Sequence, residues 1–205
     1  MLNEVSSARR SMLAAVSALS VALTIAACGP SSGSPTQTGD ALVAADVVLA
    51  PFGLDGLDAV ELVDHLDALP VEERPAGLFA SVRQDEVQLT GADGATASLA
   101  LPADTTYVSF APYVEQTHEC YFHSLTTCTG ELGGETFAVV ATDLDTGEVL
   151  VDGDVEAFPN GFIGLWLPTG TDVQVEVSID GRSATETFAT HSAGDATCVT
   201  TMQLV

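Results

Sequence analysis

Two histidines and two cysteines lie within twelve residues of this 205-residue chain, in the segment THECYFHSLTTC at residues 117–128. His118 and Cys120 are two residues apart, so an extended segment would direct both side chains to one face. His123 follows at a spacing that suits a turn, and Cys128 comes five residues later. The spacing lets one short stretch of chain direct four donors at a common point. Such donors bind Cu(I) or zinc, and the cysteines can also form a disulfide or a redox pair.

The N-terminus has the pattern of an exported lipoprotein. Arg9 and Arg10 precede an apolar run that ends in IAAC, and small residues before a cleavage point are typical of a secretory signal. The junction at Cys28 is similar to the lipobox of bacterial lipoproteins, whose cysteine carries lipid. We therefore expect a lipoprotein signal peptide over residues 1–27, a lipidated Cys28 that anchors the chain outside the cytoplasm, and a flexible tether over residues 28–40. A plain secreted protein is the alternative.

A third thiol, Cys198, lies near the C-terminus and can join the cluster only if the last strand lies beside residues 117–128. A hairpin before Cys198 would bring His191 close to it. Three thiols outside the cytoplasm are an odd number, whereas structural disulfides use cysteines in pairs. A Cys128–Cys198 or Cys120–Cys128 disulfide without a metal role would leave one thiol over. Spacing alone does not decide between that disulfide and a metal site.

The chain is strongly acidic. It contains 29 Asp and Glu residues against 5 arginines and no lysine, and the part after residue 27 has 28 acidic residues against 3 arginines. A surface of this charge repels phosphate backbones, so we expect no nucleic acid as a partner. The acidic residues do not have the spacing of a calcium-binding loop.

The elements that must position the cluster are one helix and a series of strands. Leucines at three- and four-residue spacing from Leu54 to Leu69 predict an amphipathic helix that Asp55 or Asp58 caps and Pro70 ends. Short alternating stretches bounded by turn residues predict the strands. These strands span residues 78–83, 85–90, 96–101, 105–111, 137–142, 148–151, 162–167, 172–179, 183–190 and 198–205.

Strands at this spacing, without a helical period between them, are typical of an antiparallel sandwich. The order of strands and turns over residues 137–188 also resembles the transthyretin-like or carboxypeptidase-regulatory-like sandwich. We therefore expect a mainly β fold. A small α+β region would span residues 41–103, and an antiparallel β-sandwich, transthyretin-like or Ig-like, would span residues 104–205 and hold the metal site.

The segment at residues 113–132, YVEQTHECYFHSLTTCTGEL, resembles the signature of the CueP family of extracytoplasmic copper-binding proteins. That family has two cysteines eight residues apart within such a block and a third near the C-terminus. Cys120, Cys128 and Cys198 occupy those places. The resemblance implies that the protein binds copper outside the cytoplasm and limits its toxicity, and that the cysteines reduce Cu(II) to Cu(I). Some members of the family also pass the copper to a partner.

On this basis we expect copper to bind Cys120, Cys128 and Cys198, with His118 and His123 as further ligands or as their hydrogen-bond partners. Two thiolates that become a disulfide release two electrons, and nothing in the chain restores the thiols, so we expect a stoichiometric reductant and not an enzyme. The expected partners are copper ions, the membrane through the lipid anchor and a copper-accepting protein. A homodimer is left open, as are a zinc-binding or thiol-redox envelope lipoprotein and a disulfide-stapled structural sandwich.

Overall fold

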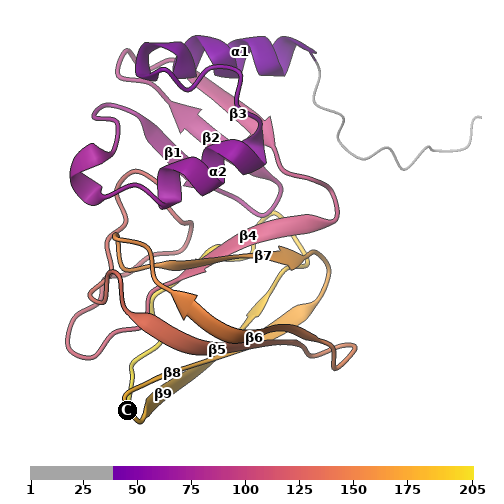
Figure 1. Ribbon diagram of the computed structural model, residues 1–205. Helices are drawn as coiled ribbons and strands as arrows, with labels where there is room; N and C mark the ends of the chain where they lie inside the picture. Colours follow the sequence, from indigo (N-terminus) through magenta and orange to yellow (C-terminus); the bar gives the residue numbers. More distant parts are fainter. Residues whose placement is uncertain (1–38) are drawn as a thin grey trace, which may run out of the picture. The chain divides into compact units, whose positions relative to one another are not determined.

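The computed structural model describes residues 39–205 (Figure 1). The predicted signal peptide, the lipidated Cys28 and the tether up to residue 38 lie outside the described residues. The last two residues of the predicted tether, Gly39 and Asp40, belong to the first turn of helix α1 (Gly39–Leu49). In residues 39–205, no helix has both the length and the apolar character that a membrane span requires.

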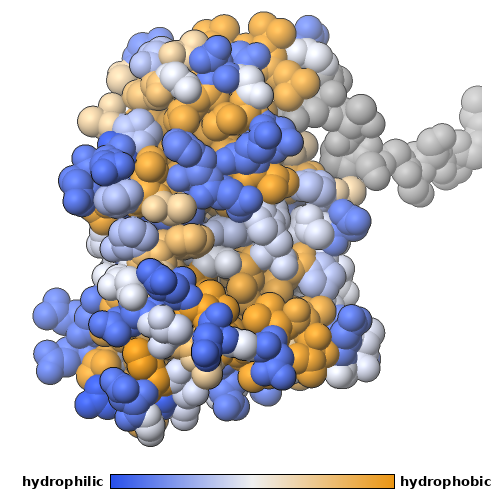
Figure 2. Space-filling model, in the orientation of Figure 1, coloured by the Kyte–Doolittle hydropathy of each residue, from blue (hydrophilic) through white to orange (hydrophobic). Residues whose placement is uncertain are grey.

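The N-terminal part packs helices α1 and α2 (Ala59–Asp67) on the antiparallel sheet β1–β2–β3. These strands are β1 (Phe79–Val82), β2 (Glu86–Thr90) and β3 (Thr96–Ala100), and short 3₁₀ turns cover Ala50–Phe52 and Val71–Glu73. Buried leucines and valines from the helices and the sheet form one core. Several apolar side chains of α1 stay exposed, and Figure 2 shows them at the surface over this helix.

Helix α2 is shorter than the predicted helix. It begins after Asp58, which accepts a hydrogen bond from the backbone of Glu61 while Glu61 accepts one from Asp58, so the two residues form a capping box. The five residues from Leu54 to Asp58 form a turn because Gly53 and Gly56 have positive φ angles, which are incompatible with a continuous helix. Leu54 is nevertheless buried, which explains why it matched the helical spacing.

The C-terminal part contains two further sheets. In the first, β4 (Thr105–Phe110) lies between β7 (Ile163–Pro168) and β10 (Cys198–Val199). The second has the order β6–β5–β8–β9, with β5 (Thr136–Asp143), β6 (Val149–Glu156), β8 (Asp172–Ile179) and β9 (Arg182–Ala189). Apolar side chains from both sheets fill a second core between them. The predicted mainly β fold with an antiparallel sandwich is therefore confirmed.

Two strand predictions differ from the structure by more than one residue at an end. The last strand covers Cys198–Val199 and not residues 198–205, and it runs parallel to β4, whereas the other named strand pairs in residues 39–205 are antiparallel. Beyond this strand, the backbone N–H groups of Leu204 and Val205 donate to the carbonyls of Tyr113 and Ser183. The C-terminal backbone therefore changes its partners, although buried side chains such as Met202 and Leu204 still alternate with exposed ones. Strand β6 extends to Glu156 because its polar second half pairs with β5 at a sheet edge.

The connection between β4 and β5, residues 111–135, carries most of the predicted metal ligands and contains no strand. It lies against the edge of β1: the His123 carbonyl accepts from the Val82 N–H at 2.8 Å, and the Leu125 N–H donates to Ala80 at 2.9 Å. On its other side the Tyr121 carbonyl accepts the N–H groups of Thr197 and Cys198. The connection therefore joins the N-terminal sheet to the C-terminal segment.

Candidate metal centre

Thr197 fixes the position of the connection beside the last strand. Its hydroxyl donates to the Val82 carbonyl at 2.7 Å and accepts the His123 N–H at 3.0 Å. One buried side chain thus ties together β1, residues 111–135 and the segment that precedes β10. The parallel pairing of β10 with β4 places Cys198 beside Ser109 in the register.

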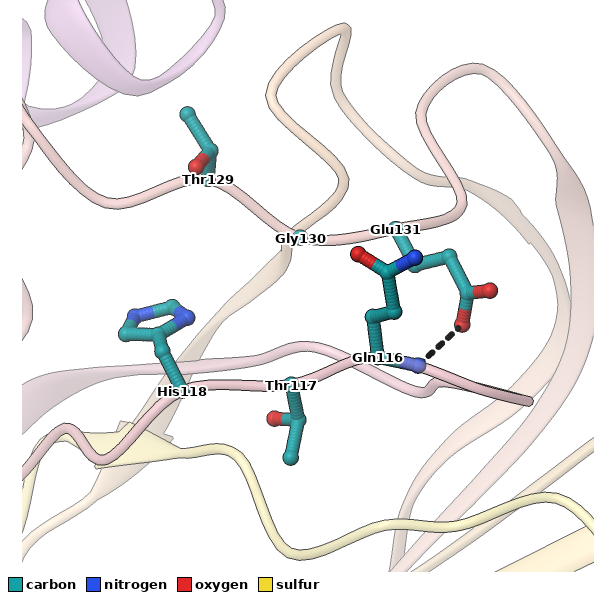
Figure 3. Close-up of a pocket in the computed structure, with 6 residues that line it drawn as sticks. All are labelled: Gln116, Thr117, His118, Thr129, Gly130 and Glu131. Carbon is teal, nitrogen blue, oxygen red and sulfur yellow. Dashed lines mark hydrogen bonds between the residues drawn. The ribbon is translucent and has the colours of Figure 1, made fainter.

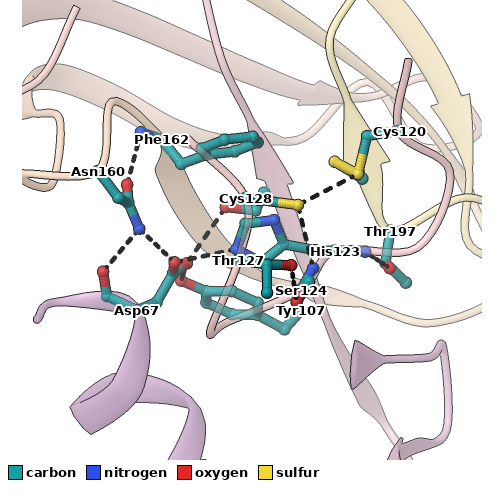
Figure 4. Close-up of polar contacts among 12 residues, drawn as sticks. Asp67, Tyr107, Cys120, His123, Ser124, Thr127, Cys128, Asn160, Phe162 and Thr197 are labelled. Carbon is teal, nitrogen blue, oxygen red and sulfur yellow. Dashed lines mark hydrogen bonds and ion pairs between the residues drawn. A yellow bond between two sulfur atoms is a disulfide. The ribbon is translucent and has the colours of Figure 1, made fainter. Parts of the chain in front are cut away.

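Cys198 reaches the cluster and forms a disulfide with Cys120, across a Cα–Cα distance of 5.6 Å. Both pairings considered from the sequence, Cys128–Cys198 and Cys120–Cys128, are therefore wrong. The Tyr121 carbonyl accepts the backbone N–H groups of Thr197 and Cys198, which brings Cys198 alongside Cys120. The spacing of cysteines in the sequence does not reveal this tertiary contact. Cys128 stays a thiol, 8% exposed, with its sulfur 3.4 Å from that of Cys120 (Figure 4).

All five residues predicted as metal ligands lie in this region. His118, Cys120 and Cys128 form one group, and His123, Cys128 and Cys198 form another, with the donor atoms of each group within 4.8 Å of one another. Cys128 belongs to both groups, so its sulfur is the common point toward which the short segment directs its donors. With Cys120 and Cys198 joined, Cys128 supplies the remaining thiol in residues 39–205.

His123 is fully buried and lies between a carboxylate and the sulfur atoms. Its Nε2 is 2.9 Å from Oδ1 of Asp67, and its Nδ1 has no hydrogen-bond partner in the part of the chain that the structure describes. Burial opposes the charged form of the imidazole, but the charge of Asp67 and the hydrogen bond to it, together with Cys128, raise the pKa of His123 to about 9. The imidazole ring packs against Phe162, with ring centroids 4.6 Å apart.

The pKa of the Cys128 thiol is lowered. Burial opposes ionisation of the thiol, while the close approach of the His123 imidazole favours the thiolate more strongly. The Ser124 N–H also lies 3.4 Å from the Cys128 sulfur. A thiolate is the form that both attacks disulfides and binds soft metal ions, so this environment prepares Cys128 for either chemistry.

Asp67, at the C-terminal end of α2, was not among the predicted site residues. Its carboxylate is fully buried and accepts hydrogen bonds from Tyr107 at 2.7 Å, Asn160 at 2.7 Å and His123 (Figure 4). It also accepts one from Ser109 at 3.2 Å. Burial raises its pKa, but the charge of His123 and these hydrogen bonds outweigh burial and leave the pKa of Asp67 below its usual value. The sequence held one signal, an acidic residue at a buried position of an amphipathic helix.

The two groups of donors differ in their access to the surface. His118 and Cys120 are partly exposed, whereas His123, Cys128 and Cys198 are buried. His118 lines two hollows, one next to Cys120 and one bounded by residues 116–117 and 129–131 (Figure 3). The His118 Nε2 has no hydrogen-bond partner in residues 39–205. His118 is therefore the member of the cluster that both hollows share.

Glu131 shapes the wall of one hollow. Its carboxylate accepts the backbone N–H groups of Val114, Glu115 and Gln116 at 2.7–3.3 Å, which holds the start of the connection in place (Figure 3). His191 belongs to neither group of donors. Its ring lies 3.2 Å from Asp172 at the surface, and β9 and β10 belong to different sheets, so the predicted hairpin that would bring His191 to Cys198 does not form.

Two comparisons with known proteins found matches to this chain. Residues 61–203 match the model of a family described as periplasmic copper-binding protein CueP. The crystal structure of S.CueP is 36% identical in sequence and superposes with a TM-score of 0.71, covering 78% of this chain and 97% of that one. No curated protein matches the chain. The matched residues include the whole sulfur and imidazole cluster, and the chain belongs to the CueP family of periplasmic copper-binding proteins.

Proposed function

We propose that this protein binds Cu(I) through the thiolates of Cys120, Cys128 and Cys198, with His118 and His123 as further nitrogen donors. The observation that carries the proposal is that a thiol, a disulfide and two imidazoles lie within one cluster centred on Cys128. Thiolate and imidazole are donors that Cu(I) accepts at low coordination number. The buried position of the cluster keeps a bound ion away from water and oxygen.

We further propose that Cys120 and Cys198 are the pair that reduces Cu(II). Two Cu(II) ions each take one electron, the two thiolates form the disulfide, and two Cu(I) ions result. The thiolate of Cys128 stays available to hold a Cu(I) ion. Because the chain has no second dithiol in residues 39–205 to restore the pair, the protein is a stoichiometric reductant that depends on an outside thiol source, and not an enzyme.

The proposed location is the outer face of a bacterial membrane. Cys28 would carry the lipid after removal of residues 1–27, and residues 28–40 would tether an α+β region (residues 41–103) and a β-sandwich (residues 104–205). Metabolic labelling with a fatty acid tests this anchor. Label on the wild-type chain and its loss in Cys28→Ala is the expected result, and equal labelling of both chains contradicts it.

The test of copper binding uses the mature chain with Cys28→Ser, fully reduced, titrated anaerobically with Cu(I) against a competing chelator. We expect tight binding of Cu(I) that falls by at least tenfold in Cys128→Ser and stays unchanged in the matched control His65→Gln, which alters an exposed histidine. Addition of Cu(II) in place of Cu(I) should consume two thiols for every two ions reduced. Unchanged affinity in Cys128→Ser would refute the thiolate site, and tight zinc binding with no Cu(I) binding would favour a zinc protein.

A further inference from the structure

We propose that Asp67 is a positioning residue for copper, which acts through His123 by holding Nε2 so that Nδ1 is the nitrogen that faces the sulfur atoms and binds the ion. This inference rests on the proposed function. The inference adds Asp67, a residue of helix α2, to the cluster of residues 118–128. Asp67 lies more than fifty positions before His123 in the sequence.

The first step is that Asp67 can only accept hydrogen bonds. Its Oδ2 lies 2.7 Å from the Tyr107 hydroxyl and 3.2 Å from that of Ser109, and its Oδ1 lies 2.7 Å from the Asn160 amide nitrogen. Asn160 also donates to the backbone carbonyl of Asp67 at 2.9 Å, which fixes the end of α2. A carboxylate surrounded by donors requires a donor from His123 as well, so Nε2 of the imidazole carries a proton.

The second step concerns the other nitrogen. Nδ1 of His123 is buried, has no hydrogen-bond partner in residues 39–205 and lies on the side of the sulfur atoms (Figure 4). A buried polar atom without a partner costs free energy, and such atoms are rare in folded proteins. The ring of Phe162 covers the imidazole and opposes its rotation. The orientation that leaves Nδ1 toward Cys128 and Cys198 is therefore fixed from both sides.

The third step is the consequence for a bound ion. A histidine that binds a metal usually donates its second N–H to a carboxylate, which fixes the ring and increases the basicity of the donor nitrogen. Asp67 has this relation to His123. Loss of such a partner typically lowers metal affinity by about 10- to 100-fold. We therefore expect Asp67 to strengthen the Cu–N bond without contact with the ion.

The experiment loads the reduced mature chain (Cys28→Ser) with Cu(I), which is diamagnetic, and observes the imidazole nitrogens by long-range ¹H–¹⁵N NMR. In the wild-type site we expect a proton on Nε2 of His123 and copper on Nδ1. Binding through Nε2, or Cu(I) bound with no change at His123, would overturn the inference and leave the thiolate site intact. Failure of the chain to bind Cu(I) at all would overturn the proposed function itself.

The variant test compares Asp67→Asn with Tyr107→Phe, which removes a different hydrogen bond from the same carboxylate and leaves the His123 contact in place. We expect Asp67→Asn to weaken Cu(I) binding by about 10- to 100-fold and to reduce the imidazole contribution to the copper X-ray absorption spectrum. Tyr107→Phe should change the affinity by less than about threefold and keep the imidazole contribution. Equal losses in both variants would show that Asp67 only stabilises the fold and would refute the positioning role.

Discussion

Substitution of Gly164 by alanine should destabilise the protein more than an ordinary glycine-to-alanine change in a strand. Gly164 pairs with Ser109 across β7 and β4, and an added Cβ would overlap the hydroxyl and the Cζ atom of Tyr107. The ring must move, which breaks its 2.7 Å hydrogen bond to Asp67. A hydrogen bond to a charged group is worth about 1.5–3 kcal/mol, and overpacking costs about 1–3 kcal/mol. We therefore expect a loss of about 2.5–6 kcal/mol in the free energy of unfolding.

Urea unfolding under non-reducing conditions measures this loss directly. The chain has one tryptophan, and the Trp166 ring lies 5.0 Å from that of Tyr107, so its fluorescence reports on the affected region. The matched control is Gly153→Ala in β6, where an added Cβ has nothing within 4 Å, and its free energy should change by less than about 1 kcal/mol. If Gly164→Ala lost no more than this control, the argument that Gly164 makes room for Tyr107 would be wrong.

Two further predictions concern the cluster. In copper-free Cys128→Ser, the free energy of unfolding should fall by at most about 3 kcal/mol between pH 6.5 and pH 10. The reason is that the raised pKa of His123, about 9, contributes stability that is present below pH 6.5 and lost as the pH rises through 9. If the urea midpoint falls as steeply after His123→Gln is added, this explanation is wrong. In the oxidised chain with Cys28→Ser, iodoacetamide should label one thiol, Cys128, slowly in the folded state and rapidly in urea. Mass spectrometry counts the labels, and two or more labels would contradict the disulfide.

The strands were predictable because their signals are local. Alternation and a two-residue turn predicted residues 172–179, which are the bounds of β8, and the turn residues Asp180 and Gly181 both have positive φ. Helix α1 was missed because its sequence, GDALVAADVVL, has no clear apolar face and follows a tether-like segment. It is a helix because Ala45, Val48 and Leu49 bury their side chains in the first core.

The site was predictable only in part, for the same physical reason. The four donors of residues 118–128 are close in sequence, so spacing alone indicated that they gather. The disulfide partner of Cys120 depends on a parallel pairing of β4 with the C-terminal segment, which no periodicity encodes. Asp67 and Asn160 meet across 93 positions, and each looks ordinary in its local sequence. Their role follows only from the tertiary structure.

The Cys120–Cys198 bond closes a ring of 78 positions that contains strands β5 to β9. A ring of this length restricts the unfolded chain enough to stabilise the fold by about 4–5 kcal/mol. Under the proposed function, reduction removes this crosslink, and a Cu(I) ion held between Cys198 and residues 120–128 closes the same ring through coordination. The protein would then alternate between a disulfide crosslink and a crosslink made by the bound copper ion. The reduced, copper-free chain would have neither crosslink and should be the form that proteases outside the cytoplasm degrade first, so that copper supply would set the lifetime of the protein.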